Sequence, residues 1–560
     1  MNNGTTPASA AVTADDAAGL ARQRERNTQR LATATGHVPK LSDAVIGAYL
    51  RSPQQALPPE PGVDAAAVLA HSLAARYRRG LRDLVLLVFS LVMGVALYYA
   101  DAGLVWFWLG FIAVWLLVRL LARVFRRRRG AERLRAGVAH VIVAFLLWSL
   151  LASELEGPLD DAFDIDDSLY ALPDSPLSSL LVIAWLAGLF AVLVSDQLLV
   201  SGGTDSPVAR LGKVVRTVGT RRHGRLLGEM SARPDSGNVL VQSGWSAFPG
   251  HGDRLNQWSM VIPLHKEGLP EGEAGGADVR PLDLYRAVAA ELRQMHTSDL
   301  LVPGSRLRGL TVDPVVAVHA GTMSAHAESP LGRTLLPDRG ERPVPAVAPE
   351  LVDQIADRGP EWARHFQRSS VAGWESDVMV STFFHVGCDD RTLYLEWSAY
   401  CLLPIDSRHS GPAASGGSVR AAALELLRFP SSLPSRVRTA AGGLRRMVLP
   451  EHGASREADY GSVQSIREVV AATEFGNEFQ ELDGLRYVKL IERRTLSAVH
   501  RHLHDNGFST DEFEARRNAV INTTVINGGT FTGANTFGAN SAARVETANA
   551  AQPAEPQEES

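Results

Sequence analysis

The sequence predicts a four-helix transmembrane region followed by a mixed α+β cytosolic domain. Two observations carry this prediction. Apolar residues concentrate between positions 84 and 200, although the chain as a whole is only 45% hydrophobic. Beyond position 220, short segments rich in β-branched and aromatic residues alternate with segments of helical periodicity. At 560 residues, the chain is long enough for two or more folded units.

Composition divides the chain into five parts. The first is rich in Ala, Pro, Gly, Thr and Gln, which is typical of disordered segments. The last is rich in Ala, Gln, Pro and Glu and is expected to be flexible. The five predicted parts are a disordered N-terminal region at 1–62, a membrane region at 63–203, a cytosolic domain at 204–517, an uncharged Gly/Asn/Thr motif at 518–544, and a disordered tail at 545–560.

Four apolar stretches are long enough to cross a bilayer. A hydrocarbon core of about 30 Å needs roughly 20 helical residues, and fewer where arginine side chains reach the interface. The predicted spans are residues 84–100, 104–121, 136–152 and 177–200. The first two are separated by only three residues and should form an antiparallel hairpin. Buried helices of a soluble core are the disfavoured alternative.

The positions of the arginines predict the orientation of these spans. Segments rich in Lys and Arg resist translocation and stay in the cytoplasm. Eight arginines lie between positions 119 and 135, whereas residues 153–176 contain neither Lys nor Arg. Both termini are therefore expected in the cytoplasm of a multi-pass plasma-membrane protein. The same basic flanks should attract anionic lipid headgroups.

The region after position 220 has clear strand and helix signals. The predicted strands are residues 238–247, 257–264, 310–320, 377–386 and 392–403, the last two joined as a hairpin by a turn at 387–390. Helices are predicted at 281–297, 418–428, 435–449 and 487–505, with a short successor after Gly507. Residues 325–360, which are rich in proline, are predicted to be a loop.

The sequence contains no recognisable catalytic, cofactor or metal motif. P-loop, GxSxG, CxxC, HExxH and dinucleotide-binding patterns are all absent. Ser246 and His251 lack a third partner, so the segment 243–252 is interpreted as a hairpin loop. His500 and His504 share a helix face without a completing ligand, and the two cysteines, Cys388 and Cys401, are read as buried thiols. We therefore expect no cofactor, no metal and no catalytic residues.

The C-terminal part has an unusual composition. Residues 518–543 contain neither a charged residue nor a proline. Short uncharged β-prone segments can stack in register, with interdigitated apolar residues and ladders of asparagine. The candidate assembly residues pair apolar anchors with Gly and Asn: Val525, Asn527, Phe531, Gly533, Asn535, Phe537, Gly538 and Asn540. The alternatives are a disordered polar tail or a strand that pairs within its own domain.

Two resemblances can be stated. The segments NVLVQSGWSAFPGHGDRLNQWSMVIPL, MVSTFFHVGCDDRTLYLEWSAYCLLP and NGFSTDEFEARRNAVIN resemble a group of uncharacterised actinobacterial multi-pass membrane proteins, over roughly residues 205–525. This resemblance implies no known activity. The segment INTTVINGGTFTGANTFGAN resembles bacterial amyloid signalling motifs related to the RIP homotypic interaction motif, although the Gln that usually precedes the Gly is absent.

Two functional hypotheses follow. The first is a membrane-anchored signalling or defence component whose tail recruits a homotypic protein partner. The second is a membrane-tethered enzyme or ligand-binding domain that follows no recognisable motif, and the missing catalytic motifs favour a non-enzymatic role. The expected partners are the lipid bilayer, anionic headgroups and a protein with a matching tail, but not nucleic acid. The basic amphipathic helix at 435–449 could lie on an anionic membrane or pack on its own domain.

Overall fold

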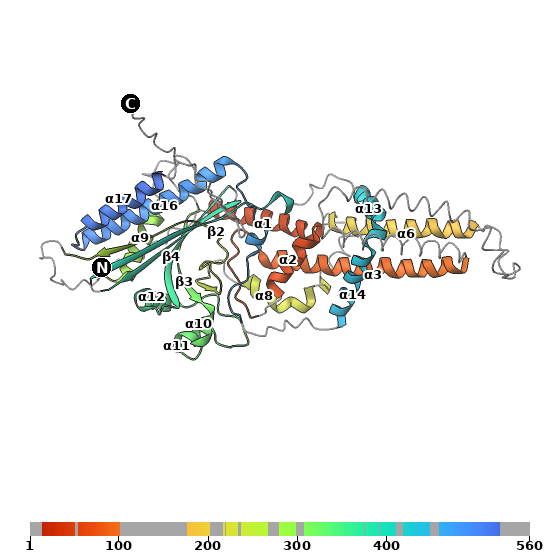
Figure 1. The fold of residues 1–560 in the computed structure, drawn as a ribbon, viewed down its shortest axis with the longest axis horizontal. Coiled ribbons are helices and arrows are strands. Elements are labelled where there is room, and N and C mark those ends of the chain that lie inside the picture. The colour runs from red at the N-terminus through yellow and green to blue at the C-terminus, as the bar shows by residue number, and fades with distance from the viewer. Residues whose placement is uncertain are drawn as a thin grey trace, which may run out of the picture. The chain divides into compact units, whose positions relative to one another are not determined.

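The structure is a computed structural model, and its chain divides into two units. The sheet unit consists of Met1–Ala75, Thr220–Gly411 and His452–Ser560, and the helical unit consists of Arg76–Gly219 and Pro412–Glu451. Figure 1 shows the helices and strands of both units. The structure describes residues 14–526 apart from 51–53, 101–175, 202–216, 219, 233–236, 267–278, 298–306, 308, 375, 390, 410–417 and 449–458.

A mixed six-stranded sheet forms the centre of the sheet unit. Its strands are β1 (Val239–Gln242), β2 (Asp253–Pro263), β3 (Thr311–His319), β4 (Ala363–Gly373), β5 (Val378–Cys388) and β6 (Thr392–Leu402). Their order is β1-β3-β4-β5-β6-β2. The β1–β3 pair is parallel and every other pair is antiparallel. The α+β prediction is confirmed.

All five predicted strands are present, and the sequence missed β4. The predicted β5–β6 hairpin is confirmed, with Phe383 opposite Ser398. The interpretation of residues 243–252 as a hairpin loop is wrong, because β1 and β2 lie at opposite edges of the sheet. This segment is therefore a connection that joins the two edges.

One face of the sheet is covered by α9 (Pro281–Thr297), α16 (Glu478–Asp505) and α17 (Asp511–Ile526). The apolar side of α9, including Val288 and Leu292, is buried against strand residues such as Val380 and Trp397. The bounds of α9 are those that the periodicity predicts. Helix α16 starts nine residues before the predicted 487, because the side chain of Asn477 caps its first turn.

The predicted loop at 325–360 contains helices. Helix α10 (Ala320–Ala325) is followed by α11 (Pro330–Leu335) and α12 (Pro349–Arg358). The Ser329 hydroxyl accepts a hydrogen bond from the backbone of Gly332, and Pro330 occupies the first helical position, where proline is favoured. The helices α10–α12 bury apolar residues against β1 and β3, so the loop prediction is wrong here.

The disorder predicted for residues 1–62 is also wrong over the described part. Helices α1 (Ala14–His37) and α2 (Pro39–Leu50) bury Leu31 and Val45. These side chains pack in one cluster with Leu69 from the start of α3 (Ala65–Ala100) and with Ile466 from α15 (Ile466–Val470). The remaining short elements are η2 (Arg221–His223), α8 (Gly224–Ala232) and η4 (Ser407–His409).

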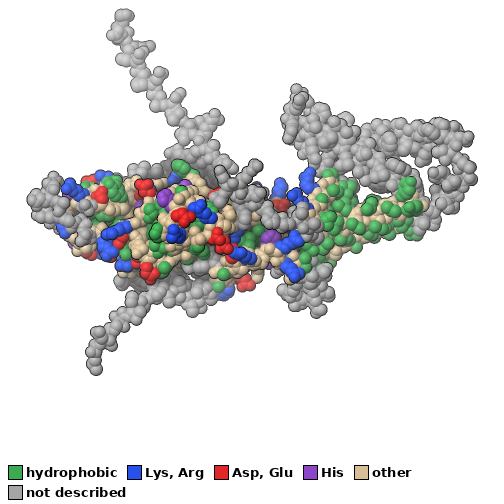
Figure 2. Space-filling model, turned by 90° about the horizontal axis from the view of Figure 1, so that it is seen from below, with side chains coloured by type: hydrophobic (Ala, Val, Ile, Leu, Met, Phe, Trp, Pro, Cys, Tyr) green, Lys and Arg blue, Asp and Glu red, His purple; other side chains and the backbone are tan. Residues whose placement is uncertain are grey.

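The helical unit contains the later part of α3, α6 (Pro176–Ser201), α13 (Ser418–Leu427) and α14 (Phe429–Val448). By length and composition, α3 and α6 are the two described helices that could cross a membrane. Apolar side chains gather on their outer surface (Figure 2). Helix α3 contains the predicted span 84–100 but begins 19 residues earlier, and α6 contains the predicted span 177–200. The predicted spans 104–121 and 136–152 lie outside the described residues.

Candidate ligand-binding site

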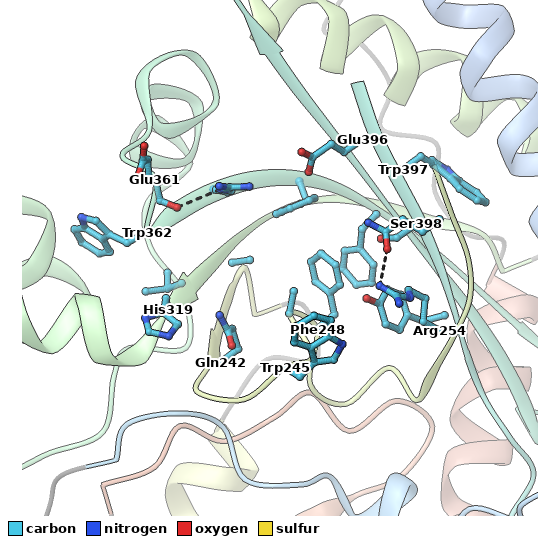
Figure 3. Close-up of a pocket in the computed structure, with 18 residues that line it drawn as sticks. Gln242, Trp245, Phe248, Arg254, His319, Glu361, Trp362, Glu396, Trp397 and Ser398 are labelled. Carbon is cyan, nitrogen blue, oxygen red and sulfur yellow. Dashed lines mark hydrogen bonds between the residues drawn. The ribbon is translucent and has the colours of Figure 1, made fainter. Parts of the chain in front are cut away.

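A cavity of about 370 Å³ lies over one face of the sheet. Neighbouring residues of a strand point to opposite faces, so Phe383 and Phe384 identify the two sides of β5. Phe384 is buried with the covering helices α9 and α16, whereas Phe383 lines the cavity. The cavity therefore occupies the face opposite those helices, and Figure 3 shows side chains from β1, β3, β4, β6, β2 and the 243–252 connection around it.

Aromatic rings form the floor of the cavity. Phe248, from the 243–252 connection, stacks on Phe383 with a centroid distance of 3.6 Å and an interplanar angle of 8°. Phe366 and Tyr400 meet the ring of Phe248 edge-on at 4.9 and 5.4 Å. Stacked and edge-on arrangements are both favourable for aromatic pairs, so these contacts stabilise the floor.

The 243–252 connection is held in place by backbone geometry and by one carboxylate. Gly250 and Gly252 have φ values of +87° and +80°, which side chains on an L-residue rarely allow. Their backbone N–H groups donate to Oε1 of Glu468 at 2.8 and 3.2 Å. Between them, Nδ1 of the buried His251 lies 3.0 Å from Oγ of Ser381. These contacts fix Phe248 over the sheet.

Trp245 belongs to the same connection and is 95% exposed at the rim of the cavity (Figure 3). A large aromatic side chain in water forgoes the free energy that burial would supply, about 25 cal/mol for each Å² of apolar surface. In a cavity rim, such a residue offers apolar surface to a ligand.

Two arginines and two glutamates supply charge to the lining. Arg254 donates to the side-chain oxygen of Gln257, and Nε of Arg364 donates to the carbonyl of Glu361 at 3.2 Å. Among the residues that the structure describes, neither guanidinium has a carboxylate within ion-pair distance. Glu361 and Glu396 complete the charged lining.

The sheet opens beside the cavity. Pairing of β4 with β5 stops at Gln367 and Phe384, and the hydroxyl of Tyr285 from α9 enters the gap. That hydroxyl accepts the N–H of Val386 at 2.7 Å, and Nδ1 of His385 donates to the carbonyl of His365 at 2.7 Å. Buried side chains thus satisfy backbone groups that the ladder leaves unpaired.

The titratable groups near this opening are held neutral. Burial raises the pKa of the Tyr285 phenol well above its usual value. Burial, reinforced by neighbouring His385, lowers the pKa of His365 to about 3. Burial, reinforced by the Arg368 guanidinium, also lowers the pKa of His251 to about 3. These histidines therefore have structural roles at neutral pH.

The structure separates most of the residues that the sequence singled out. Ser246 is exposed, and the serine that accompanies His251 is the buried Ser381 instead. His500 lies 2.8 Å from Glu514, and the part of the chain that is described holds no cluster of three metal-ligating side chains. Cys401 is buried as expected, and burial raises the pKa of its thiol to about 12, whereas Cys388 is only half-buried.

The uncharged motif is only partly covered. Helix α17 continues to Ile526, so the backbone of Val525 is helical in this structure. The other seven assembly candidates, from Asn527 to Asn540, lie outside the described residues.

Sequence reasoning missed the cavity because its lining residues come from five separate stretches of the chain: 242–257, 317–319, 361–366, 383 and 396–400. The available signals were Trp245 between small residues and the glycines Gly250 and Gly252, which mark a constrained connection. Residues 257–534 match the family model of the AbeC-like domain. An AbeC-like domain is thus present in this chain. No curated protein and no solved structure matches the chain.

The AbeC-like domain covers β2 to β6 and most of the described helices that follow β2, and it overlaps the region 205–525 for which a family resemblance was expected. The match begins after β1 and after the connection that carries Trp245 and Phe248. The AbeC-like domain therefore provides Arg364 and Glu396, whereas the aromatic rim comes from the preceding segment.

Proposed function

We propose that this chain is a membrane-tethered binding protein whose AbeC-like domain takes up a small anionic ligand with a planar aromatic part. The observation that carries the proposal is the pairing, in one cavity, of a preformed aromatic floor with two arginines that have no carboxylate partner among the described residues. Pockets that bind small molecules typically combine apolar walls with a few placed polar groups.

The lining favours a ligand that is flat at one end and negatively charged at another. Trp245 is 95% exposed and offers a flat ring surface to a ligand, whereas the stacked Phe248 and Phe383 are buried and shape the cavity beneath it. A guanidinium matches carboxylate, phosphate or sulfonate oxygens with two parallel N–H groups. Glu361 and Glu396 can accept hydrogen bonds from a ligand that also carries a donor group.

Binding is favoured over catalysis by the arrangement of the lining. A nucleophile needs a base within hydrogen-bond reach. Among the described lining residues, His319 bonds to Thr322 of its own turn, and Ser398 has no histidine in hydrogen-bond contact. Ser381 and His251 form a buried serine–histidine pair, but neither residue lines the cavity.

The membrane tether rests on the apolar stretches and on the arginine asymmetry. Helices α3 and α6 have the length and hydropathy of spans, and two further apolar stretches of the sequence complete four. Eight arginines between 119 and 135 against none in 153–176 favour cytoplasmic termini. The ligand would then be a cytoplasmic one.

A signalling output through the tail is a second candidate, favoured by 26 consecutive uncharged residues at 518–543. A synthetic peptide of residues 518–544 should form thioflavin-positive fibres. Asp at Phe531 or Phe537 should prevent assembly, because stacking would bury repelling charges about every 4.7 Å. A monomeric wild-type peptide, or fibres from both Asp variants, would remove this candidate.

The ligand proposal is tested with full-length protein in lipid nanodiscs and naphthalene-1,5-disulfonate as the probe. This probe carries two aromatic rings and two sulfonates, the two kinds of group that the lining favours. Arg254→Gln and Arg364→Gln should each weaken calorimetric binding about tenfold, since a charged hydrogen bond contributes about 1.4 kcal/mol or more. Arg391→Gln, at an exposed arginine of the β5–β6 turn, is the matched control.

Two comparisons make this experiment decisive. Naphthalene-1,5-diol, which has the rings without the charges, should bind more weakly than the disulfonate. Trp245→Ala should weaken binding of both probes, whereas Phe479→Ala, at an exposed ring of α16, should not. Equal losses from Arg391→Gln and the two cavity variants, or no binding of either probe, would contradict the proposal.

A further inference from the structure

Helices α13 and α14 belong to the helical unit, although the sequence places them in the soluble domain. Helix α13 packs along α6. Ala422 and Phe429 are buried in one cluster with Leu86 of α3 and with Leu189 and Leu193 of α6. The two helices therefore bury apolar surface against candidate membrane spans.

The positions of Leu86 and Leu189 within the predicted spans show how far this contact extends along α3 and α6. Leu86 lies inside the predicted span 84–100, and Leu189 lies near the middle of the predicted span 177–200. Leu189 is seven residues from Asp196, which corresponds to about 10 Å along a helix. A cluster that contains both leucines thus reaches beyond the charged end of α6 into its apolar part.

A set of linked ion pairs lies at the charged end of α6. Arg436 of α14 bonds to Asp83 at 2.8 Å and to Glu425 of α13 at 2.9 Å. Arg82 contacts Glu425 at 3.1 Å and Asp196 at 3.0 Å, and Asp196 also lies 3.0 Å from Nε of Arg78.

This set contains three arginines and three carboxylates, so its positive and negative charges are equal in number. Asp83, Asp196 and Arg436 are buried. Charges in a low-dielectric region are tolerated when they are paired, and each of these six groups lies within 3.1 Å of an oppositely charged partner in the set. The set therefore fits a location at the edge of a hydrocarbon layer.

The backbones of α14 and α3 come close at two glycines. A Cβ atom built on Gly443 would lie 3.4 Å from the Cα atom of Gly80. Such small-residue contacts allow helices to approach in a membrane, where packing rather than the hydrophobic effect drives association. The contact aligns α14 beside the residues that precede the first predicted span.

The outward surface of the pair is apolar and basic. Leu427, at the turn between the helices, is 80% exposed, and Leu424, Val437 and Leu444 are also exposed. Residues 418–448 contain six arginines and one acid, Glu425, which is already bound to arginines. Among the described residues, the exposed Arg438 and Arg445 have no ion-pair partner.

We propose that α13 and α14 form a hairpin seated in the cytoplasmic leaflet, with acyl chains covering Leu424 and Leu427 and anionic phospholipid headgroups on Arg438 and Arg445. This rests on the proposed membrane location. The bilayer is chosen as the occupant because the apolar surface of the hairpin continues that of α3 and α6 in the same unit. The net positive charge of the hairpin, from six arginines and one acid, matches anionic headgroups.

Spin labels on full-length protein in nanodiscs test whether the hairpin lies in the lipid bilayer. The background is Cys388→Ser, because the buried Cys401 has little access to a labelling reagent. Labels at Leu427→Cys and Leu444→Cys should collide more often with oxygen, which concentrates in lipid, than with the neutral water-soluble nickel complex NiEDDA. Leu482→Cys, an exposed leucine of α16 in the sheet unit, should show the opposite order.

A label at the exposed Leu186 of α6 distinguishes failure of the hairpin proposal from failure of the proposed membrane location. If Leu186→Cys reports lipid and Leu427→Cys reports water, the hairpin proposal fails while the membrane proposal stands. If Leu186→Cys reports water, the membrane location itself fails. A label at position 427 that collides with neither reagent would reveal a protein partner and overturn the lipid assignment.

The headgroup part is tested by changing the lipid charge. Adding phosphatidylglycerol to phosphatidylcholine nanodiscs should reduce the NiEDDA collision rate at Leu444→Cys about twofold. The double variant Arg438→Gln, Arg445→Gln should lose this response, whereas Arg391→Gln should keep it. The same collision rate in both lipids for the unchanged hairpin would overturn the headgroup assignment.

Discussion

Glu60 is a buried carboxyl group whose charge should cost stability above neutral pH. The Tyr49 hydroxyl and the backbone N–H of Ile466 donate to its Oε1, while Oε2 has no hydrogen-bond partner among the described residues. Burial raises the pKa of Glu60 to about 7, and the neighbouring Glu468 carboxylate adds to the rise. The folded chain therefore binds a proton here more tightly than the unfolded chain.

The magnitude follows from proton linkage. A rise from the ordinary 4.5 to about 7 corresponds to about 3 kcal/mol, at 1.36 kcal/mol per pH unit. The folded state holds more protons than the unfolded state between these values, so stability decreases as pH rises through this window. The contribution is fully present below pH 4.5 and is lost above about pH 7.

Glu60→Gln should remove this dependence, because glutamine resembles the protonated acid and still accepts from Tyr49 and Ile466. At pH 8 the variant should be more stable than wild type by about 3 kcal/mol, and at pH 4.5 the two should agree within about 1 kcal/mol. The measurement is denaturant unfolding of the full chain in detergent, followed by tryptophan fluorescence at both pH values.

Glu474→Gln is the matched control, since Glu474 is exposed. It should change the free energy of unfolding by less than about 0.5 kcal/mol at either pH. A difference between Glu60→Gln and wild type that is the same at pH 4.5 and pH 8 would refute a raised pKa. A variant less stable than wild type at pH 8 would show that the ionised carboxylate is favourably paired.

Three further outcomes are expected. A cysteine at Ser168 should be labelled from outside intact cells and one at Gly130 only after lysis; the reverse pattern would invert the orientation. Gly252→Ala should lower the free energy of unfolding by 2 kcal/mol or more, because a Cβ there would overlap a β6 carbonyl at positive φ, whereas Gly244→Ala, with open space around it, should be nearly neutral. Arg436→Gln should lower the free energy of unfolding in detergent by about 3 kcal/mol, because it leaves the carboxylates of Asp83 and Glu425 short of a partner. If Arg438→Gln, at an exposed arginine, costs as much, the ion-pair account is wrong.

Local periodicity predicted the elements whose burial is one-sided. Helix α9 shows a single apolar face with Leu284, Val288 and Leu292, and its bounds follow from the sequence. The hairpin of β5 and β6 has strong β-prone runs on both sides of a turn, so its pairing could also be predicted.

The sequence analysis missed elements whose polar side chains find their hydrogen-bond and ion-pair partners in distant parts of the chain. Strand β4 carries Arg364, His365, Gln367 and Arg368 in close succession, which hides its alternation. Arg368 is buried because it lies 3.5 Å from Asp313 of β3, a contact that local sequence does not reveal. Helix α1 has few strongly apolar residues, and its order depends on burying positions such as Leu31 against distant segments.

The candidate site could not be predicted for a related reason. Arg254 and Arg364 are 110 positions apart, and only the order of strands in the sheet brings their segments to one cavity. The floor depends on Phe248, whose position is set by hydrogen bonds from Gly250 and Gly252 to Glu468, more than 200 residues away. Spacing within the sequence carries no information about such a contact.

The assignment of α13 and α14 to the soluble domain shows the limit of amphipathic patterns. A helix with Val437 and Leu444 beside arginines has the same pattern whether it packs on a soluble core or on a membrane. The ion pairs of Arg436 with Asp83 of α3 and Glu425 of α13 show that α14 packs on the helical unit. A domain of residues 204–517 alone would lack Asp83 and the apolar surface of α6. Helices α13 and α14 of the AbeC-like domain therefore find their ion-pair and packing partners outside the boundaries of that domain.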